Sequence, residues 1–141
     1  MNLESDFFTN NIVLFAALGI IIALILRMEI KRALTGTQTV TPAQAVQLIN
    51  KEDALILDIR EDNELAQGSI RGSKHFALSI LKQRVDELKQ YTDKPVIAYC
   101  KMGNRSSEAC NILRQNDFTN VLSLKGGLEA WKNENLPVVK K

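Results

Sequence analysis

The segment Pro95-Val-Ile-Ala-Tyr-Cys100-Lys-Met-Gly-Asn-Arg-Ser106 decides the fold of this chain. Residues 95–99 are a short apolar run, which is typical of a buried strand. Residues 106–115 have the pattern of a helix. Cys100 therefore stands between the carboxyl end of a strand and the start of a helix. In open α/β sheets, functional residues gather at such junctions.

Outward from this segment, helical and strand signals alternate along the chain. Thr41 followed by Pro42 predicts an N-cap and the first residue of a helix that continues through Ile49. The remaining predictions are strands at 54–59, 74–77 and 120–124 and helices at 61–67, 80–90 and 127–133. Strands separated by helices predict parallel pairing, and hence a layered α/β fold.

The N-terminus is apolar, with no polar side chain between residues 12 and 26. Extended back to Phe7, a helix over residues 7–26 would rise about 30 Å, which matches the hydrocarbon core of a bilayer. We therefore expect a membrane anchor and its basic flank in residues 1–32, a linker in 33–38 and one α/β domain in 39–139. A buried core helix is disfavoured, because a helix that is apolar all round needs a larger protein to cover it.

The charges beside the apolar run predict its orientation. Glu4 and Asp6 precede it, whereas a cleaved signal peptide normally begins with basic residues. Arg27, Lys31 and Arg32 follow it, so the positive-inside rule places the domain in the cytoplasm. We expect a single-pass protein of the cell (inner) membrane that contacts the lipid bilayer through its N-terminal helix. A reducing cytoplasm suits a free thiol.

Composition excludes several classes of protein. The 141 residues are 24 % charged and 45 % hydrophobic, as in a globular protein. A net charge of +2 gives no electrostatic footprint for nucleic acid. Two cysteines and one histidine make neither a disulfide framework nor a usual four-ligand zinc site. We expect no metal and no cofactor.

The loop after Cys100 has the chemistry of an anion cradle. The N-terminus of the following helix offers unpaired N–H groups and a partial positive charge. Gly103 allows the backbone to curl, and Lys101 and Arg105 add positive charges at the rim. Such surroundings lower a thiol pKa and favour the nucleophilic thiolate. The alternative is that Cys100 is a small buried hydrophobic residue at a strand end.

Three ordered motifs resemble the rhodanese family of single-domain sulfurtransferases. The segment Cys100-Lys-Met-Gly-Asn-Arg-Ser106 is similar to the active-site loop of that family. The others are Leu57-Asp-Ile-Arg-Glu61 with Glu64-Leu65 and Gly68-Ser-Ile-Arg-Gly-Ser73, and Leu124-Lys-Gly-Gly-Leu-Glu-Ala-Trp131 with Leu136-Pro-Val138. The resemblance covers residues 39–139. It implies a five-stranded parallel sheet flanked by helices.

The same resemblance implies a sulfurtransferase. Cys100 would take a sulfur atom from thiosulfate or a persulfide donor, become a persulfide, and pass the sulfur to cyanide or a thiol. The donor would be a small anion or a protein persulfide. Asp58 and Arg60 would support the loop by a salt bridge or a cap. The residues expected to line the substrate site are Lys101, Met102, Gly103, Asn104 and Arg105.

Two alternative functions are compatible with a cysteine loop of this kind. A membrane-tethered domain of this kind could instead dock other membrane proteins, with little catalysis. Related cysteine phosphatases place five residues between the cysteine and the arginine, whereas four separate Cys100 from Arg105, which favours sulfur over phosphate. Ser69 stands where the family usually has histidine, and we interpret that change as structural. Cys110, His75 and Trp131 are expected to have packing or surface roles.

Overall fold

The computed structural model describes the backbone of residues 3–140, and the side chains of these residues except 3–6 and 31–35. The chain forms two compact units, Met1–Gly36 and Thr37–Lys141. Each unit is considered by itself.

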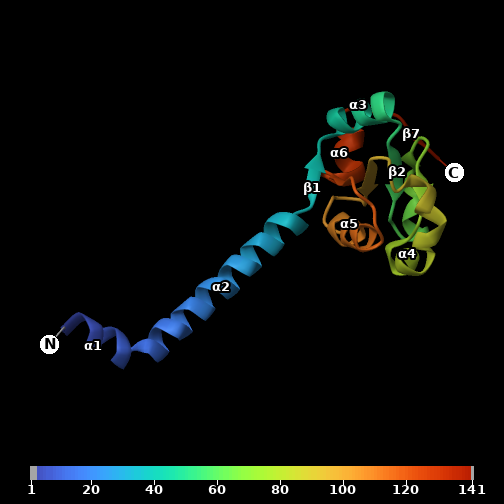
Figure 1. Ribbon diagram of the computed structural model, residues 1–141. Helices are drawn as coiled ribbons and strands as arrows, with labels where there is room; N and C mark the ends of the chain where they lie inside the picture. Colours follow the sequence, from blue (N-terminus) through green and yellow to red (C-terminus); the bar gives the residue numbers. More distant parts are fainter. Residues whose placement is uncertain (1–2, 141) are drawn as a thin grey trace. The chain divides into compact units, whose positions relative to one another are not determined.

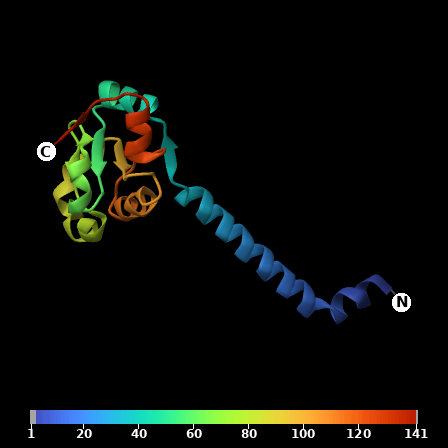
Figure 2. The same cartoon turned by 180° about the vertical axis from the view of Figure 1, so that it is seen from behind.

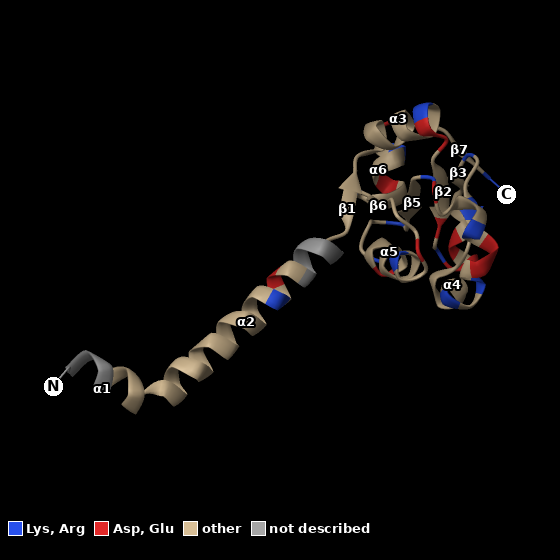
Figure 3. Cartoon of the chain, viewed as in Figure 1, with Lys and Arg blue, Asp and Glu red and all other residues tan. Residues whose placement is uncertain are grey.

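The N-terminal unit consists of helices α1 (Leu3–Asn10) and α2 (Ile12–Thr35) (Figure 1). Within α2, residues 12–30 are long and apolar enough to cross a membrane. Figure 3 shows most of α2 without charged residues, and the first charge within it in the sequence is Arg27. The expected helix at 7–26 is instead interrupted at Asn11, whose side-chain amide donates to the carbonyl of Phe7 at 2.8 Å. Helix α2 also continues through residues 33–35, which lie in the segment expected to be a linker.

The second unit confirms the predicted five-stranded parallel sheet. The strands are β1 (Gln38–Val40), β2 (Leu55–Asp58), β4 (Lys74–His75), β5 (Val96–Tyr99) and β6 (Val121–Leu124), in the order β1-β6-β5-β2-β4. Helices cover both faces of the sheet (Figures 1 and 2). One face packs against α3 (Pro42–Glu52) and α6 (Gly127–Asn133), and the other packs against α4 (Leu78–Arg84), η2 (Val85–Tyr91) and α5 (Ser106–Gln115).

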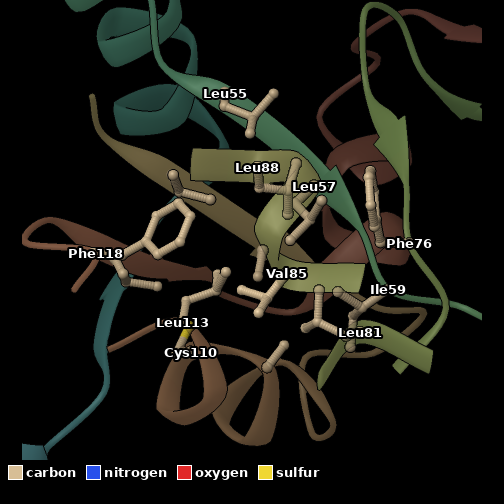
Figure 4. Packing of buried hydrophobic residues seen from close by; sticks show 14 of the residues in the cluster. Leu55, Leu57, Ile59, Phe76, Leu81, Val85, Leu88, Cys110, Leu113 and Phe118 are labelled. Atoms are coloured by element: carbon tan, nitrogen blue, oxygen red, sulfur yellow. The ribbon is translucent and has the colours of Figure 1, made fainter. Parts of the chain in front are cut away.

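Successive side chains of the short central strands point to opposite faces of the sheet, which divides the core into two layers. In β2, Leu55 and Leu57 face the layer of α4, η2 and α5, while Ile56 faces the opposite layer. Figure 4 shows the first of these layers, where Phe118 and the helix residues Leu81 and Leu113 meet β2. Because both faces are covered, strands β2, β5 and β6 are buried throughout.

Some local details differ from the sequence prediction. The segment expected as a helix at 61–67 forms the 3₁₀ helix η1 (Asp62–Gln67), and the helix expected at 80–90 is divided between α4 and the 3₁₀ helix η2. In η2, Val85 and Leu88 are buried, as their spacing predicts. The apolar periodicity therefore identified the buried residues but did not distinguish a 3₁₀ helix from an α-helix. Two strands of two residues, β3 (Ser69–Ile70) and β7 (Val138–Val139), pair antiparallel without any sequence pattern.

A buried polar network joins the sheet to the segment after η1. Arg60 donates two hydrogen bonds to the carboxylate of Asp58, at 2.9 and 2.7 Å, and Tyr99 donates a third at 2.7 Å. The same guanidinium donates to the carbonyl of Gly68 at 2.8 Å and to the hydroxyl of Ser69 at 3.2 Å. Burial, followed by the charge of Asp58, raises the pKa of Tyr99 to about 12. The expected Asp58–Arg60 salt bridge is therefore present, and Ser69 has a structural contact.

Replacing Arg60 by methionine should destabilise the domain strongly. The charge of Asp58 would remain buried after its partner is removed, which typically costs about 3–5 kcal/mol. Urea denaturation of the detergent-solubilised protein measures the loss. The matched control is Lys89→Met, which removes an exposed ion pair with Asp86 and should leave the midpoint unchanged. Equal midpoints for Arg60→Met and the wild type would show that the buried pair does not support the fold.

Candidate active site

Cys100 lies directly after β5, and its side chain is buried. Residues 101–105 form a loop that turns back toward the sulfur, and α5 begins at Ser106. Gly103 adopts a φ of +93°, a conformation that favours glycine, and its N–H donates to the Cys100 Sγ at 3.0 Å. The expected positions of strand, loop and helix are therefore the observed ones.

Helix α6 holds the loop from outside. The N–H groups of Leu128 and Glu129 donate to the carbonyls of Cys100 and Lys101, at 2.9 and 3.1 Å. The first two loop carbonyls are thereby directed to α6, which leaves the later N–H groups of the loop to face the sulfur. This close approach requires Gly127: a Cβ atom there would lie 2.4 Å from the carbonyl oxygen of Cys100.

The loop favours the thiolate of Cys100. Burial by itself raises the pKa of this thiol, but the surrounding N–H groups outweigh burial and the pKa is lowered overall. These N–H groups belong to Arg105, Gly103, Met102 and Ser106. Since hydrogen bonds to the charged form stabilise it, the thiolate fraction at neutral pH exceeds that of an ordinary cysteine.

The remaining loop side chains have different surroundings. The Ser106 hydroxyl donates to the carbonyl of Gly103 at 3.1 Å and contacts the hydroxyl of Ser123 at 2.5 Å, so it fixes the start of α5. The Asn104 side-chain oxygen lies 3.8 Å from the Cys100 Sγ. Met102 is the large apolar side chain of the loop, and it is 66 % exposed.

Arg105 differs from its expected state. The sequence indicated two positive charges at the rim, but both terminal nitrogens of Arg105 donate to the carboxylate of Glu64, at 2.8 and 2.6 Å. Chiefly this pairing, opposed by burial, lowers the pKa of Glu64 to about 2. Sequence reasoning missed the contact because the partners are 41 positions apart, and the only signal was the motif that contains Glu64.

Lys101 and the supporting residues complete the site. Within the part of the chain that the structure describes, Lys101 has no carboxylate in ion-pair range. Arg60 reaches the loop indirectly, since it donates to the carbonyl of Glu64 at 3.1 Å and Glu64 in turn holds Arg105. Asp58 acts one step further back, through Arg60.

The residues expected to have packing or surface roles make structural contacts. Cys110 is buried beside Leu113 (Figure 4), and burial raises the pKa of its thiol to about 11. His75 contacts the backbone carbonyl of Arg60 at 2.6 Å. Trp131 is buried and donates to the carbonyl of Pro137. Among the described residues, no group of three or more histidine, cysteine or acidic side chains is placed to hold a metal.

A parallel α/β sheet with a stabilised thiolate at a strand end defines a protein built for nucleophilic sulfur chemistry. The model of the rhodanese-like domain matches residues 41–134, and the chain belongs to that family. The uncharacterized protein YibN of Escherichia coli is 37 % identical over 111 residues, which are 78 % of each chain. A protein of Allochromatium vinosum named sulfurtransferase is 38 % identical and covers 66 % of this chain and 85 % of its own length.

A solved structure supports the same assignment. The crystal structure of a rhodanese-related protein from Thermoplasma volcanium has a TM-score of 0.66 and 32 % identity, and the match covers 74 % of this chain and 99 % of that one. At the level of the family, the chain is a sulfurtransferase.

Substituting Gly127 by alanine should disturb the loop more than the fold. The new Cβ would meet the Cys100 carbonyl, push the loop from α6 and raise the pKa of the Cys100 thiol. Alkylation rates against pH, with the modified peptide identified by mass, measure that pKa. The control is Gly72→Ala, because Gly72 also has positive φ but no atom within 4 Å of the added Cβ. Both variants bear a strain of about 1–2 kcal/mol, so an equal thiol pKa in the two would contradict the role of Gly127.

Proposed function

We propose that the protein transfers a sulfane sulfur through a persulfide on Cys100. The observation that carries this proposal is the buried Cys100 thiol, whose pKa is lowered by N–H groups of its own loop. A low pKa supplies the attacking thiolate. The same N–H groups, fixed before the reaction, would stabilise the negative charge of the persulfide, as an oxyanion hole does for oxygen.

The reaction has two halves. The Cys100 thiolate attacks the outer sulfur of thiosulfate or of a persulfide, a new S–S bond forms, and the old S–S bond breaks. Its electron pair leaves with sulfite or with the donor thiolate. In the second half, cyanide or a thiolate attacks the outer sulfur of the Cys100 persulfide, and the Cys100 thiolate leaves. No net oxidation of the protein occurs, and Lys101 supplies positive charge at the entrance.

Changing Cys100 to serine should abolish turnover and leave the fold intact, since a hydroxyl of similar size has no sulfur to transfer. Release of sulfite from thiosulfate and formation of thiocyanate from cyanide measure the reaction, and mass spectrometry detects one added sulfur atom on the wild type. Cys110→Ala is the matched control and should keep most of the activity.

Two results would contradict this mechanism. Turnover by Cys100→Ser above a few per cent of the wild type would exclude the Cys100 persulfide. Loss of activity in Cys110→Ala as complete as in Cys100→Ser would assign Cys110 a chemical role. A wild-type protein that accepts sulfur from no donor would leave the docking of other membrane proteins as the function.

We further propose that α2 anchors the domain in the inner membrane with Cys100 on the cytoplasmic side. The apolar stretch 12–30 within α2 supports the anchor, and Arg27 with the following Lys31 and Arg32 supports the orientation. A tethered sulfurtransferase would act on donors and acceptors at the membrane surface.

Protease added to sealed, right-side-out cells should spare the domain, and an alkaline wash should not release it from the membrane fraction. Permeabilised cells serve as the control and should show rapid cleavage. Cleavage in the sealed cells would place the domain outside. A mature protein that begins near residue 37 would indicate export with removal of the N-terminal helix.

A further inference from the structure

The ion pair between Glu64 and Arg105 places a fixed negative charge beside the cysteine loop. Glu64 is held at the loop by two kinds of contact: its Oε2 accepts the N–H of Glu61 at 2.9 Å, and both of its oxygens accept from Arg105. Only about a quarter of the Glu64 side chain and about a third of the Arg105 side chain are exposed. The pair is therefore a built part of the site rather than a chance surface contact.

Glu64 remains a carboxylate at every pH at which the thiolate can react. The Arg105 hydrogen bonds, opposed by burial, hold the pKa of Glu64 at about 2, so the carboxyl does not take up a proton near neutrality. The positive charge of Arg105 is consequently cancelled, close to the sulfur, by a fixed negative charge.

The charges of the loop and its partner then balance. Arg105 and Lys101 are positive, while Glu64 and the Cys100 thiolate are negative. A dianion such as thiosulfate would meet no net positive charge there and would be held mainly by backbone N–H groups. One of those, the Gly103 N–H, is already directed at the sulfur at 3.0 Å.

The loop also carries an exposed apolar side chain. The side chain of Met102 is 66 % exposed. A thioether is a weak acceptor with no proton to donate, so it cannot bind a sulfonate oxygen. It offers an apolar contact instead, which suits the carbon chain of an organic thiol.

We propose that the sulfur donor is an organic persulfide, R–S–SH, and that Glu64 excludes thiosulfate by neutralising Arg105. This inference rests on the proposed sulfurtransferase function and selects between its two donors. The Cys100 thiolate attacks the outer sulfur, the Cys100–sulfur bond forms, the R–S bond to that sulfur breaks, and its electron pair leaves as R–S⁻. The proton stays on the transferred sulfur.

The test compares two donors in single-turnover reactions of the full chain in detergent, with the Cys100 persulfide followed by mass. The donors are thiosulfate and N-acetylcysteine methyl ester persulfide, which has no charge beyond its reacting group. Glu64→Gln retains the size and one acceptor oxygen for Arg105 but removes the negative charge and the second acceptor. It should raise the ratio of the thiosulfate rate to the ester persulfide rate on the order of tenfold.

Asp62→Asn is the matched control. It removes the same charge from the same 3₁₀ helix, but Asp62 is 93 % exposed and does not contact Arg105, so the ratio of rates should stay at the wild-type value. The salt dependence of the wild type is a second measurement that needs no variant. Its thiosulfate rate should change little with ionic strength, whereas that of Glu64→Gln should fall.

The outcomes separate the two levels of the proposal. An unchanged ratio in Glu64→Gln, with both rates lowered together, would show that Glu64 only positions Arg105 and would overturn the selection of the donor. A wild type that prefers thiosulfate would also overturn it, while the Cys100 persulfide would stand. Failure of both donors to place sulfur on Cys100 would instead overturn the sulfurtransferase function itself.

The carrier of the persulfide is distinguished by a third donor. A short neutral peptide with one cysteine persulfide presents the same reacting group on a polypeptide. A peptide rate above that of the methyl ester would support a protein donor, and an equal rate would support a small thiol carrier. Both results agree with an organic persulfide, and a rate for both below that of thiosulfate contradicts it.

Discussion

The close contact between the cysteine loop and the start of α6 is the constraint on which the site depends. Two loop carbonyls accept N–H groups of α6, and the space between them admits no Cβ at Gly127. A peptide cannot direct its carbonyl and its N–H to the same side. Once α6 has taken the carbonyls, the loop can place its own N–H groups around the sulfur. The thiolate is thus stabilised by backbone geometry rather than by a side-chain charge alone.

A second chain of contacts connects the core to the rim of the site. Asp58 at the end of β2 holds Arg60, Arg60 donates to the carbonyl of Glu64, and Glu64 binds Arg105. The buried ion pair of Asp58 and Arg60 contributes little net stability by itself, because the desolvation of two charges offsets their attraction. Its effect is positional, since the five donors of an arginine can fix several backbone groups at once. Support of the loop by Asp58 and Arg60 is therefore relayed through Glu64.

The sequence predicted those features that depend on local pattern. Helices α5 and α6 begin and end at the predicted residues. A buried strand and its loop precede α5, and the glycines at 126 and 127 mark the start of α6. Cys100 and its loop were found for the same reason. Strands β1, β3 and β7 were not predicted, since two or three residues cannot show alternation. The role of Glu64 depends on a contact across 41 residues, which no local pattern records.

Two separate sets of contacts support the site: those between the cysteine loop and α6, and those from Asp58 through Arg60 and Glu64 to Arg105. The N–H groups that surround Cys100 are neutral dipoles, so they stabilise the thiolate whether or not Arg105 is paired. The full charges belong to loop side chains, and that of Arg105 also interacts with the Cys100 thiolate. Under the proposal for the donor, a change at Glu64 would alter which donor is admitted more than it alters the reactivity of the sulfur. Conversely, a change at Gly127 acts on reactivity first. Under the proposals above, the reactivity of the sulfur depends chiefly on the contact with α6, and the selection of the donor depends on Glu64 in η1.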